Sequence, residues 1–384
     1  MRIGLIVDTL DDNIHGAGNY VYNITNRILD LDKRNEYVLI HTKNPSLTNP
    51  YHDIFSRCQE LIIKPPPLVT KWTERMIVKY LSFSQILKRE DFDLIHEMSD
   101  LRPMSYIPSL KVITSHGVAT RAFKEPLAIW KKLSREVNYN MIKGIFKKTI
   151  EIITPSNSTK RDIIKYYGVS PDRISVIYHG VNKEIFKPID NVKDIKERYQ
   201  IGGPFILYVG RTVPSKNVEG IIKAFHKLKK RKIPHKLVIV SAKDYGYSKI
   251  LSTIKEFNLQ SEIVFAGTLP HENLAKVYNA ADLFVFPSYY ESFALPPLEA
   301  MACGTPVITS NTSSLPEQVG DAAITVDPRD FNRLAEAMYE VLTNEGLRKD
   351  LIQRGLSRAK MFTWERCAQE TLRIYDKVCA VGVK

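Results

Sequence analysis

Short apolar runs alternate with longer amphipathic segments along the chain. This alternation predicts parallel strands joined by helices that cover both faces of a sheet, the doubly wound α/β class. In the first half, strands are predicted at residues 3–8, 37–41, 61–63, 94–96, 111–115, 150–155 and 174–177. A second series begins near Pro204, with strands predicted at residues 205–210, 236–241, 263–266, 283–287, 306–310 and 323–326.

The two series of strands indicate two domains. The chain has 384 residues, of which 44% are hydrophobic, and this length exceeds what one hydrophobic core usually supports. Residues 188–203 form the predicted linker, so that the first domain spans residues 1–187 and the second spans residues 188–363. A last helix is predicted from Trp364 to about Val378.

The segment FPSYYESFALPPLEAMACGTPVI places Glu291 and Glu299 eight positions apart around a predicted helix start. Pro296 and Pro297 suit the first helical positions, where a missing N–H costs no hydrogen bond, and Gly304 is typical of a helix end. Glu299 is therefore expected in the first helical turn and Glu291 on the loop before it. The N–H groups of a helix start bind anions, and carboxylates accept hydrogen bonds from polyols such as a ribose or a hexose.

Two cationic residues, Arg211 and Lys216, follow an apolar strand of the second domain, with Asn217 at the next helix start. In doubly wound folds, ligands bind at this carboxyl edge of the sheet. The chain has 55 Lys and Arg residues, and most of them are expected to be solvated. The position of these two favours a role in binding, because two cations can neutralise the charge of an anionic ligand.

In the first domain, Gly16-Ala17-Gly18 follows a predicted strand and precedes a helix, and His116 ends another strand. Position 21 is Val where a dinucleotide fingerprint has Gly, so a plain turn is the alternative for the glycine loop. Small side chains here would let the backbone approach a phosphate. A structural role is the alternative for His116.

Together, these motifs resemble those of the retaining glycosyltransferases of family 4, whose signature is Glu-x7-Glu. The resemblance extends over nearly the whole chain and rests on residues 16–18, 208–217, 265–267, 291–299 and 315–323. It implies the GT-B fold, in which two Rossmann-like domains face each other across a cleft. It also implies that the first domain binds the acceptor, the second binds the nucleotide-sugar donor, and residues 364–384 pack back on the first.

The resemblance implies which groups bind the donor. Glu291 would bind the hydroxyls of the donor sugar, and Glu299 those of the ribose. Backbone N–H groups around Phe293, Ala294 and Leu295 would face the sugar and the phosphate. Relatives often have Gly where Ala294 stands, so the approach is expected to be tighter here. The loop Gly16-Ala17-Gly18 would let the backbone approach the donor diphosphate.

The resemblance also implies the catalytic residues, namely His116, Arg211, Lys216 and Glu291. Retaining enzymes of this type are thought to react on one face of the sugar, with the leaving phosphate oxygen taking the acceptor's proton. A covalent glycosyl-enzyme on Glu291 is the pattern of two-carboxylate hydrolases instead. His116 would hydrogen-bond the sugar or support the charge at its anomeric carbon. Many relatives have His-Asp where this chain has His116-Gly117, which leaves the shape of that loop open.

No metal or other cofactor is expected. The Asp-x-Asp matches at residues 30–32 and 91–93 fall at a helix end and at a strand entry, away from the ligand edge. The four cysteines have no CxxC spacing, which argues against a metal or disulfide role. Helix dipoles and basic side chains can take over the work of a divalent ion.

The donor and the acceptor are harder to assign. Residues 310–317 look most like those of members that transfer mannose from GDP-mannose, while UDP-glucose and UDP-N-acetylglucosamine remain open. The expected acceptor is a glycan or a lipid-linked glycan. Loops of the first domain, including residues 65–72 and 119–126, are expected to bind it.

The formal net charge of +13 suggests an anionic partner. Residues 121–148 carry eight basic and two acidic residues with apolar ones among them. This segment suits an anionic membrane surface, and an ordinary solvated helix is the alternative. The N-terminal apolar run is too short for a signal peptide, and no run reaches the length of a membrane span. The expected location is cytoplasmic, with peripheral association at the inner face of the cell membrane.

Three other functions fit parts of the sequence. Nucleic-acid binding would explain a pI of 9.3, but the sequence has no recognisable nucleic-acid-binding module. No nucleic-acid partner is therefore expected. Sugar-nucleotide epimerases share the architecture, although the carboxylate pair followed by Ala-Met-Ala-Cys-Gly fits a transferase better. The third alternative is a non-catalytic subunit that binds a nucleotide-sugar. The chain has the complete set of expected site residues, which argues against this alternative: Arg211, Lys216, Glu291 and Glu299.

Overall fold

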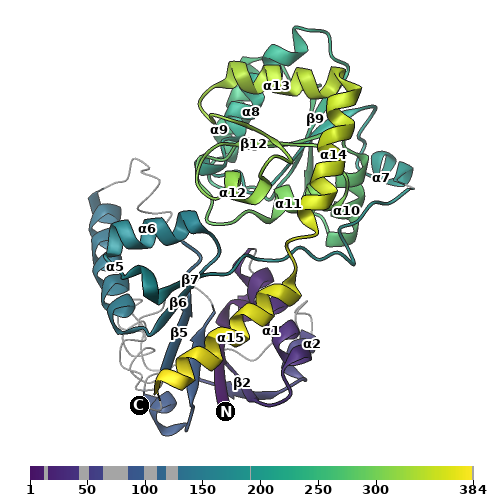
Figure 1. Cartoon of the computed structure of the whole chain (residues 1–384). Helices are drawn as coiled ribbons and strands as arrows, with labels where there is room; N and C mark the ends of the chain where they lie inside the picture. The colour runs from purple at the N-terminus through teal and green to yellow at the C-terminus, as the bar shows by residue number, and fades with distance from the viewer. Residues whose placement is uncertain are drawn as a thin grey trace. The chain divides into compact units, whose positions relative to one another are not determined.

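The computed structural model describes residues 1–12, 16–42, 52–63, 85–98, 110–117, 129–190 and 192–382 (Figure 1). The chain divides into two compact units. The first comprises Met1–His179 and Trp364–Lys384, and the second comprises Gly180–Thr363. The expected acceptor loops at residues 65–72 and 119–126 lie outside the described residues.

The boundary between the units lies at residue 179, whereas the sequence analysis placed it at 187. Residues after 179 bond within the second unit. The Val181 N–H donates to the Phe362 carbonyl (3.2 Å), and the Asn279 side chain donates to the Lys187 carbonyl (2.9 Å). Hydrogen bonds between residues so far apart in the sequence leave no trace in the pattern of apolar residues, so the sequence analysis could not locate this boundary.

In the first unit, the described residues form a seven-stranded parallel sheet in the order β3-β2-β1-β4-β5-β6-β7. Its strands are β1 (Arg2–Ile6), β2 (Glu36–His41), β3 (Gln59–Ile62), β4 (Leu94–Glu97), β5 (Leu110–Thr114), β6 (Glu151–Thr154) and β7 (Ile174–Val176). Its helices are η1 (Asp8–Asp12), α1 (Ala17–Leu31), α2 (His52–Phe55), α5 (Ile129–Lys148), α6 (Asn157–Tyr167), η2 (Pro171–Arg173) and α15 (Trp364–Gly382). The strand order reverses between β1 and β4, which is where doubly wound sheets bind ligands.

The last helix, α15, belongs to the first unit and runs alongside α1 (Figure 1). Its buried Tyr375 hydroxyl shares a hydrogen bond with His96 Nδ1 (2.7 Å), and Lys377 pairs with the buried Glu151 (2.8 Å). The end of the chain is thus tied to two strands of the first sheet.

In the second unit, a six-stranded parallel sheet has the order β10-β9-β8-β11-β12-β13. Its strands are β8 (Phe205–Val209), β9 (Lys236–Val240), β10 (Ile263–Gly267), β11 (Leu283–Phe286), β12 (Val307–Ser310) and β13 (Ile324–Val326). Its helices are α7 (Lys193–Arg198), η3 (Pro214–Lys216), α8 (Val218–Lys229), α9 (Tyr247–Glu256), α10 (His271–Ala280), α11 (Leu295–Ala302), α12 (Leu315–Val319), α13 (Phe331–Thr343) and α14 (Glu345–Ala359). The order reverses between β8 and β11.

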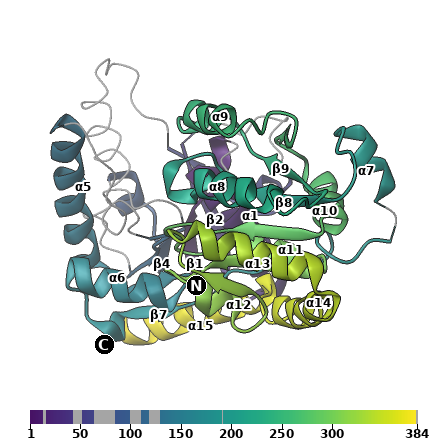
Figure 2. The same cartoon turned by 90° about the horizontal axis from the view of Figure 1, so that it is seen from above.

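The helices of the second unit form two layers. Helices α9, α8 and α13 pack in a row against one face of the sheet, and Figure 2 shows α8 and α13 side by side. Helices α10, α11 and α14 pack together against the other face (Figure 1). Every residue of β8 is buried, as expected for a central parallel strand covered on both faces.

The described residues contain no helix that is both long enough and apolar enough to cross a bilayer. The basic segment predicted at residues 121–148 is described only from 129 onward, as α5. On the described part of α5, Ile145 and Phe146 are buried while Lys147 and Lys148 are exposed.

Candidate functional site

The centre of the candidate site in the second unit is an ion pair between Lys216 and Glu291. Lys216 Nζ lies 2.5 Å from Glu291 Oε1 and 2.7 Å from Oε2. Their side chains are only 20% and 8% exposed. Lys216 follows β8 and Glu291 follows β11, the neighbouring strands at which the order reverses. The pair therefore lies at the topological switch point, where doubly wound sheets bind ligands.

Hydrogen bonds hold the two loops that carry this pair together. Asn217 adopts the left-handed conformation (φ 58°), and its buried side chain donates to the Pro287 carbonyl (3.1 Å). At Gly220, an added Cβ would lie 2.4 Å from Asn217 Oδ1, so a larger residue would displace that side chain. The Tyr289 N–H also donates to the Ser215 carbonyl (2.8 Å). These contacts fix the distance between the Lys216 and Glu291 backbones.

Glu299 is buried and paired with a tyrosine. Its carboxylate accepts a hydrogen bond from the hydroxyl of Tyr278 in α10 (3.0 Å). Burial raises the pKa of Glu299 to about 7, and the bond from Tyr278 opposes this rise. The prediction that Glu299 lies in the first helical turn is wrong. The helix starts at Leu295, with both prolines inside its first turn, so Glu299 lies in the second turn.

Arg211 is held by an acid that the sequence analysis did not single out. Arg211 donates from Nε to Asp244 Oδ2 (3.0 Å) and from Nη2 to Oδ1 (2.8 Å), a bidentate pair in which the arginine stays 58% exposed. The Asp244 N–H donates to Thr212 Oγ1 (3.0 Å). An added Cβ at Gly246 would lie 2.1 Å from the Thr212 carbonyl oxygen, so the two loops touch. The sequence did contain a signal for Asp244, because this acidic residue comes shortly after the apolar strand β9.

Ala294 has a different role from the predicted one. Its N–H donates to Gln318 Oε1 (3.0 Å), and its carbonyl accepts from Gln318 Nε2 (3.0 Å). The Ala294 N–H is thus already bonded to protein and does not face a ligand. Phe293 and Leu295, the other two predicted donors, flank this anchored residue. The sequence could not show that a residue 24 positions away takes this N–H.

The first unit brings its own predicted residues together. Gly16 caps α1 with φ 61°, and its carbonyl accepts the Tyr20 N–H (3.0 Å). The Tyr20 ring packs edge-on against the His116 ring, with centroids 4.7 Å apart. His116 Nε2 donates to the Met98 carbonyl (2.9 Å). The glycine loop and His116 therefore meet at the carboxyl edge of the first sheet.

Two further histidines surround this cluster and were not predicted. His96 is fully buried between the Tyr375 hydroxyl and Thr114 Oγ1 (2.7 and 2.9 Å), and burial lowers its pKa to about 3. Burial likewise lowers the pKa of His179, whose ring stacks on Trp364 at 5.8 Å between centroids. Both are therefore neutral at physiological pH. Neither lies in a recognisable motif, so only the fold reveals them.

The described residues contain no group of three or more His, Cys, Asp or Glu that could hold a metal ion. The two Asp-x-Asp segments make structural hydrogen bonds instead. Asp32 accepts from the Tyr37 hydroxyl (2.6 Å), and Asp93 accepts from the Arg2 N–H (2.7 Å).

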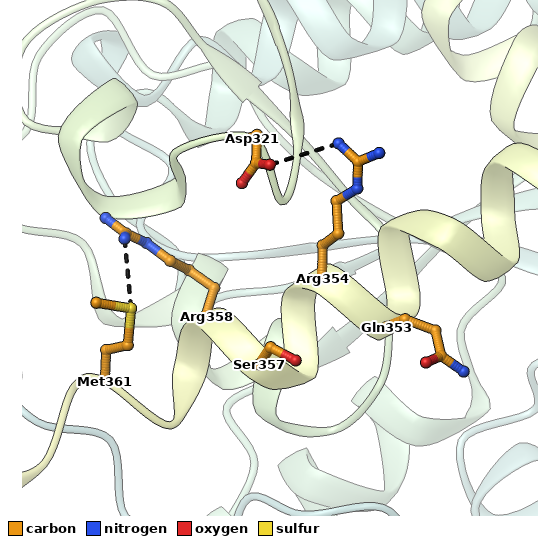
Figure 3. Close-up of a pocket in the computed structure, with 6 residues that line it drawn as sticks. All are labelled: Asp321, Gln353, Arg354, Ser357, Arg358 and Met361. Carbon is orange, nitrogen blue, oxygen red and sulfur yellow. Dashed lines mark hydrogen bonds and ion pairs between the residues drawn. The ribbon is translucent and has the colours of Figure 1, made fainter.

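A separate surface pocket of about 360 Å³ lies along α14 (Figure 3). It is lined by Asp321, Gln353, Arg354, Ser357, Arg358 and Met361. Arg354 and Arg358 extend from one helix, and Arg354 faces Asp321 at 3.5 Å. None of the predicted donor-binding or catalytic residues lines this pocket.

Two sequence families match the chain and divide it as the fold does. The family described as Glycosyltransferase Family 4 matches residues 14–185, and the family described as Glycosyl transferases group 1 matches residues 176–358. The chain belongs to these glycosyltransferases. The chain is 32% identical over 227 residues to the O-antigen chain mannosyltransferase B of Escherichia coli. That match covers 58% of this chain and 60% of the relative.

Solved structures confirm the predicted GT-B fold. The chain superposes on sucrose-phosphate synthase from Thermosynechococcus elongatus with a TM-score of 0.79 at 23% identity, covering 99% of both chains. Anabaena HepE, in complex with UDP and glucose, gives a TM-score of 0.78 at 16% identity, with 98% of this chain and all of that chain covered. At such identities, the likeness concerns the fold alone.

Proposed function

We propose that this protein is a retaining glycosyltransferase that moves mannose from GDP-mannose to a glycan or lipid-linked acceptor. The observation that carries the proposal is the Lys216–Glu291 ion pair at the switch point of the second sheet. It combines a cation for a diphosphate with a carboxylate for sugar hydroxyls. The mannosyltransferase relative supports mannose as the sugar.

The residues take separate tasks in the proposed reaction. Glu291 orients the sugar, Glu299 accepts hydrogen bonds from the ribose, and Lys216 and Arg211 stabilise the charge on the leaving diphosphate. The bond from the anomeric carbon to the acceptor oxygen forms on the face from which the phosphate leaves. The acceptor's proton passes to the leaving phosphate oxygen. His116 is proposed to hydrogen-bond the sugar.

We further propose that no metal ion takes part. Lys216 and Arg211 supply two positive charges beside the start of α8, whose N–H groups add the positive end of a helix dipole. This charge would do for the diphosphate what a divalent ion does in other transferases. Activity should therefore be unchanged in EDTA and should not rise when Mg²⁺ or Mn²⁺ is added.

The first experiment measures thermal stabilisation by GDP-mannose, GDP, UDP-glucose, UDP-N-acetylglucosamine and UDP, each with and without EDTA. A ligand at 100 times its dissociation constant adds about 2.7 kcal/mol of stability. Stabilisation by GDP-mannose and by GDP, but by none of the UDP compounds, supports the proposal. UDP-glucose is the second candidate donor, because HepE, which shares the fold, is complexed with UDP and glucose. Stabilisation by the UDP compounds alone would replace the proposed donor with a UDP-sugar. No stabilisation by any nucleotide would refute the donor site.

A matched pair of variants tests catalysis. Glu291→Gln keeps the shape of the side chain but removes the charge that pairs with Lys216, and we expect transfer to fall at least a hundredfold. Glu336→Gln makes the same change on α13, where the side chain is 53% exposed, and should leave transfer unchanged. A Glu291→Gln variant that folds, binds GDP and transfers at the wild-type rate would show that the carboxylate is dispensable.

The basic helix α5 suggests peripheral association with an anionic membrane. Its apolar Ile145 and Phe146 pack inside the first unit, which leaves Lys147 and Lys148 on the surface. Each basic residue near an anionic surface contributes about 1 kcal/mol at low salt. Cosedimentation with phosphatidylserine vesicles, but not with phosphatidylcholine vesicles, is expected, and Lys147→Glu with Lys148→Glu should weaken it. Equal binding to both vesicles would contradict an electrostatic attachment.

A further inference from the structure

The amide side chain of Gln318 is fully buried beside the loop that carries Glu291. Its Oε1 accepts from the Ala294 N–H (3.0 Å) and from the Ser314 hydroxyl (3.1 Å), and its Nε2 donates to the Ala294 carbonyl (3.0 Å). One side chain thus binds both polar groups of one backbone residue. Burying an amide is costly unless it is hydrogen-bonded, and here three bonds compensate it.

The helix that carries Gln318 is itself anchored. Arg358 donates from Nη2 to the Glu317 carbonyl (2.6 Å) and from Nε to the Gln318 carbonyl (2.8 Å). These are carbonyl groups at the end of the short helix α12, which have no partner within the helix. Figure 3 shows Arg358 extending from α14. Gln318 is therefore a fixed point against which a loop can be positioned.

The loop from Glu291 to Ala294 has no helix or strand of its own. At its start, the Glu291 N–H donates to Ser313 Oγ (2.9 Å), and its carbonyl accepts the Ser314 N–H (3.3 Å). At its end, Ala294 is held by Gln318. The loop is therefore clamped at both ends by one segment, residues 313–318, which follows β12.

We propose that Gln318 is a positioning residue that sets the donor preference of this site for an intact nucleotide-sugar over the free nucleoside diphosphate. This inference rests on the proposed function, in which the Glu291 loop binds the sugar while Glu299, Lys216 and Arg211 bind the nucleotide. Gln318 acts on the loop alone. Loosening it should weaken the sugar contacts and spare the nucleotide contacts.

The test compares dissociation constants for two pairs of probes, GDP-mannose with GDP and UDP-glucose with UDP, in wild type and in Gln318→Met. Methionine fills a similar volume but cannot pair with the Ala294 peptide. With the two hydrogen bonds to Ala294 lost, we expect binding of the intact nucleotide-sugar to weaken about tenfold, while binding of the diphosphate changes less than about twofold. Equal changes for both probes, or no change for either, would overturn the proposal.

A control and a rescue separate positioning from simple loss of stability. Asn344→Ala removes the side chain that caps the start of α14 through the Leu347 N–H (3.0 Å), at the opposite end of that helix from Arg358. It should lower the melting temperature and leave the ratio of the two affinities unchanged. Gln318→Glu should regain the wild-type ratio at low pH, because a protonated carboxyl can accept from the Ala294 N–H and donate to its carbonyl. The absence of this rescue would count against the clamp, even if Gln318→Met fails to fold.

The same measurements distinguish the two levels of inference. If wild type binds neither nucleotide-sugar, the proposed function fails, and the role of Gln318 fails with it. If wild type binds one of them and the ratio in Gln318→Met is unchanged, only the role of Gln318 fails.

Discussion

Replacing Glu299 by Gln should stabilise the second unit at high pH. Gln keeps the shape of the side chain and can still accept the hydrogen bond from Tyr278. It removes the charge that wild type must bury when Glu299 ionises. Because Glu299 is also proposed to bind the ribose, the variant should at the same time bind donor nucleotide more weakly.

The size of the effect follows from the pKa of Glu299. The ordinary value is 4.5, and burial raises it to about 7 in the folded protein. Between these values, the folded state holds a proton that the unfolded state has lost, so the free energy of unfolding falls as the pH rises. This rise in the pKa of Glu299 is equivalent to about 3 kcal/mol. This penalty is fully present above the folded pKa and absent below the unfolded one, and Glu299→Gln removes it.

Urea unfolding at pH 5 and pH 8 tests this reasoning, with hydrogen exchange of the peptide that contains α11 as the readout, so that the second unit is followed. Most of the titration lies between these pH values, so the stability of the variant relative to wild type should rise by about 2 to 3 kcal/mol from pH 5 to pH 8. Glu336→Gln, at an exposed position, should show no such rise. The same offset at both pH values for Glu299→Gln would refute a raised pKa.

Two further substitutions test the charges around the site. Lys216→Met leaves the nearly buried Glu291 carboxylate without its cation and should cost about 2 kcal/mol of stability in urea unfolding. The double variant with Glu291→Gln should cost less than the sum of the two single changes. Additive costs would show that the two side chains are not coupled. Asp244→Asn removes the negative charge that pairs with Arg211. It should tighten GDP binding, measured by calorimetry, about threefold at low salt and less at high salt. Weaker binding would show instead that Asp244 orients Arg211 for the ligand.

Much of the fold could be predicted because strands of a buried parallel sheet are short and continuously apolar. The predicted strand at residues 205–210 is β8, at Phe205–Val209, and the one at 283–287 is β11, at Leu283–Phe286. The glycine at position 304 and the two prolines correctly marked the ends of α11. The helix nevertheless starts at Leu295, because Pro296 and Pro297 tolerate the second and third positions as well as the first.

What the sequence alone determined was the class of each site residue and the strand it follows. Lys216 and Glu291 could be placed after two apolar strands, because local periodicity is written in neighbouring residues. Only the tertiary structure decided their partners. Asp244 reaches Arg211 across 33 positions, and Gln318 reaches Ala294 across 24. Such contacts depend on strand order and helix packing, which bring distant segments within hydrogen-bonding distance and leave no local pattern in the chain.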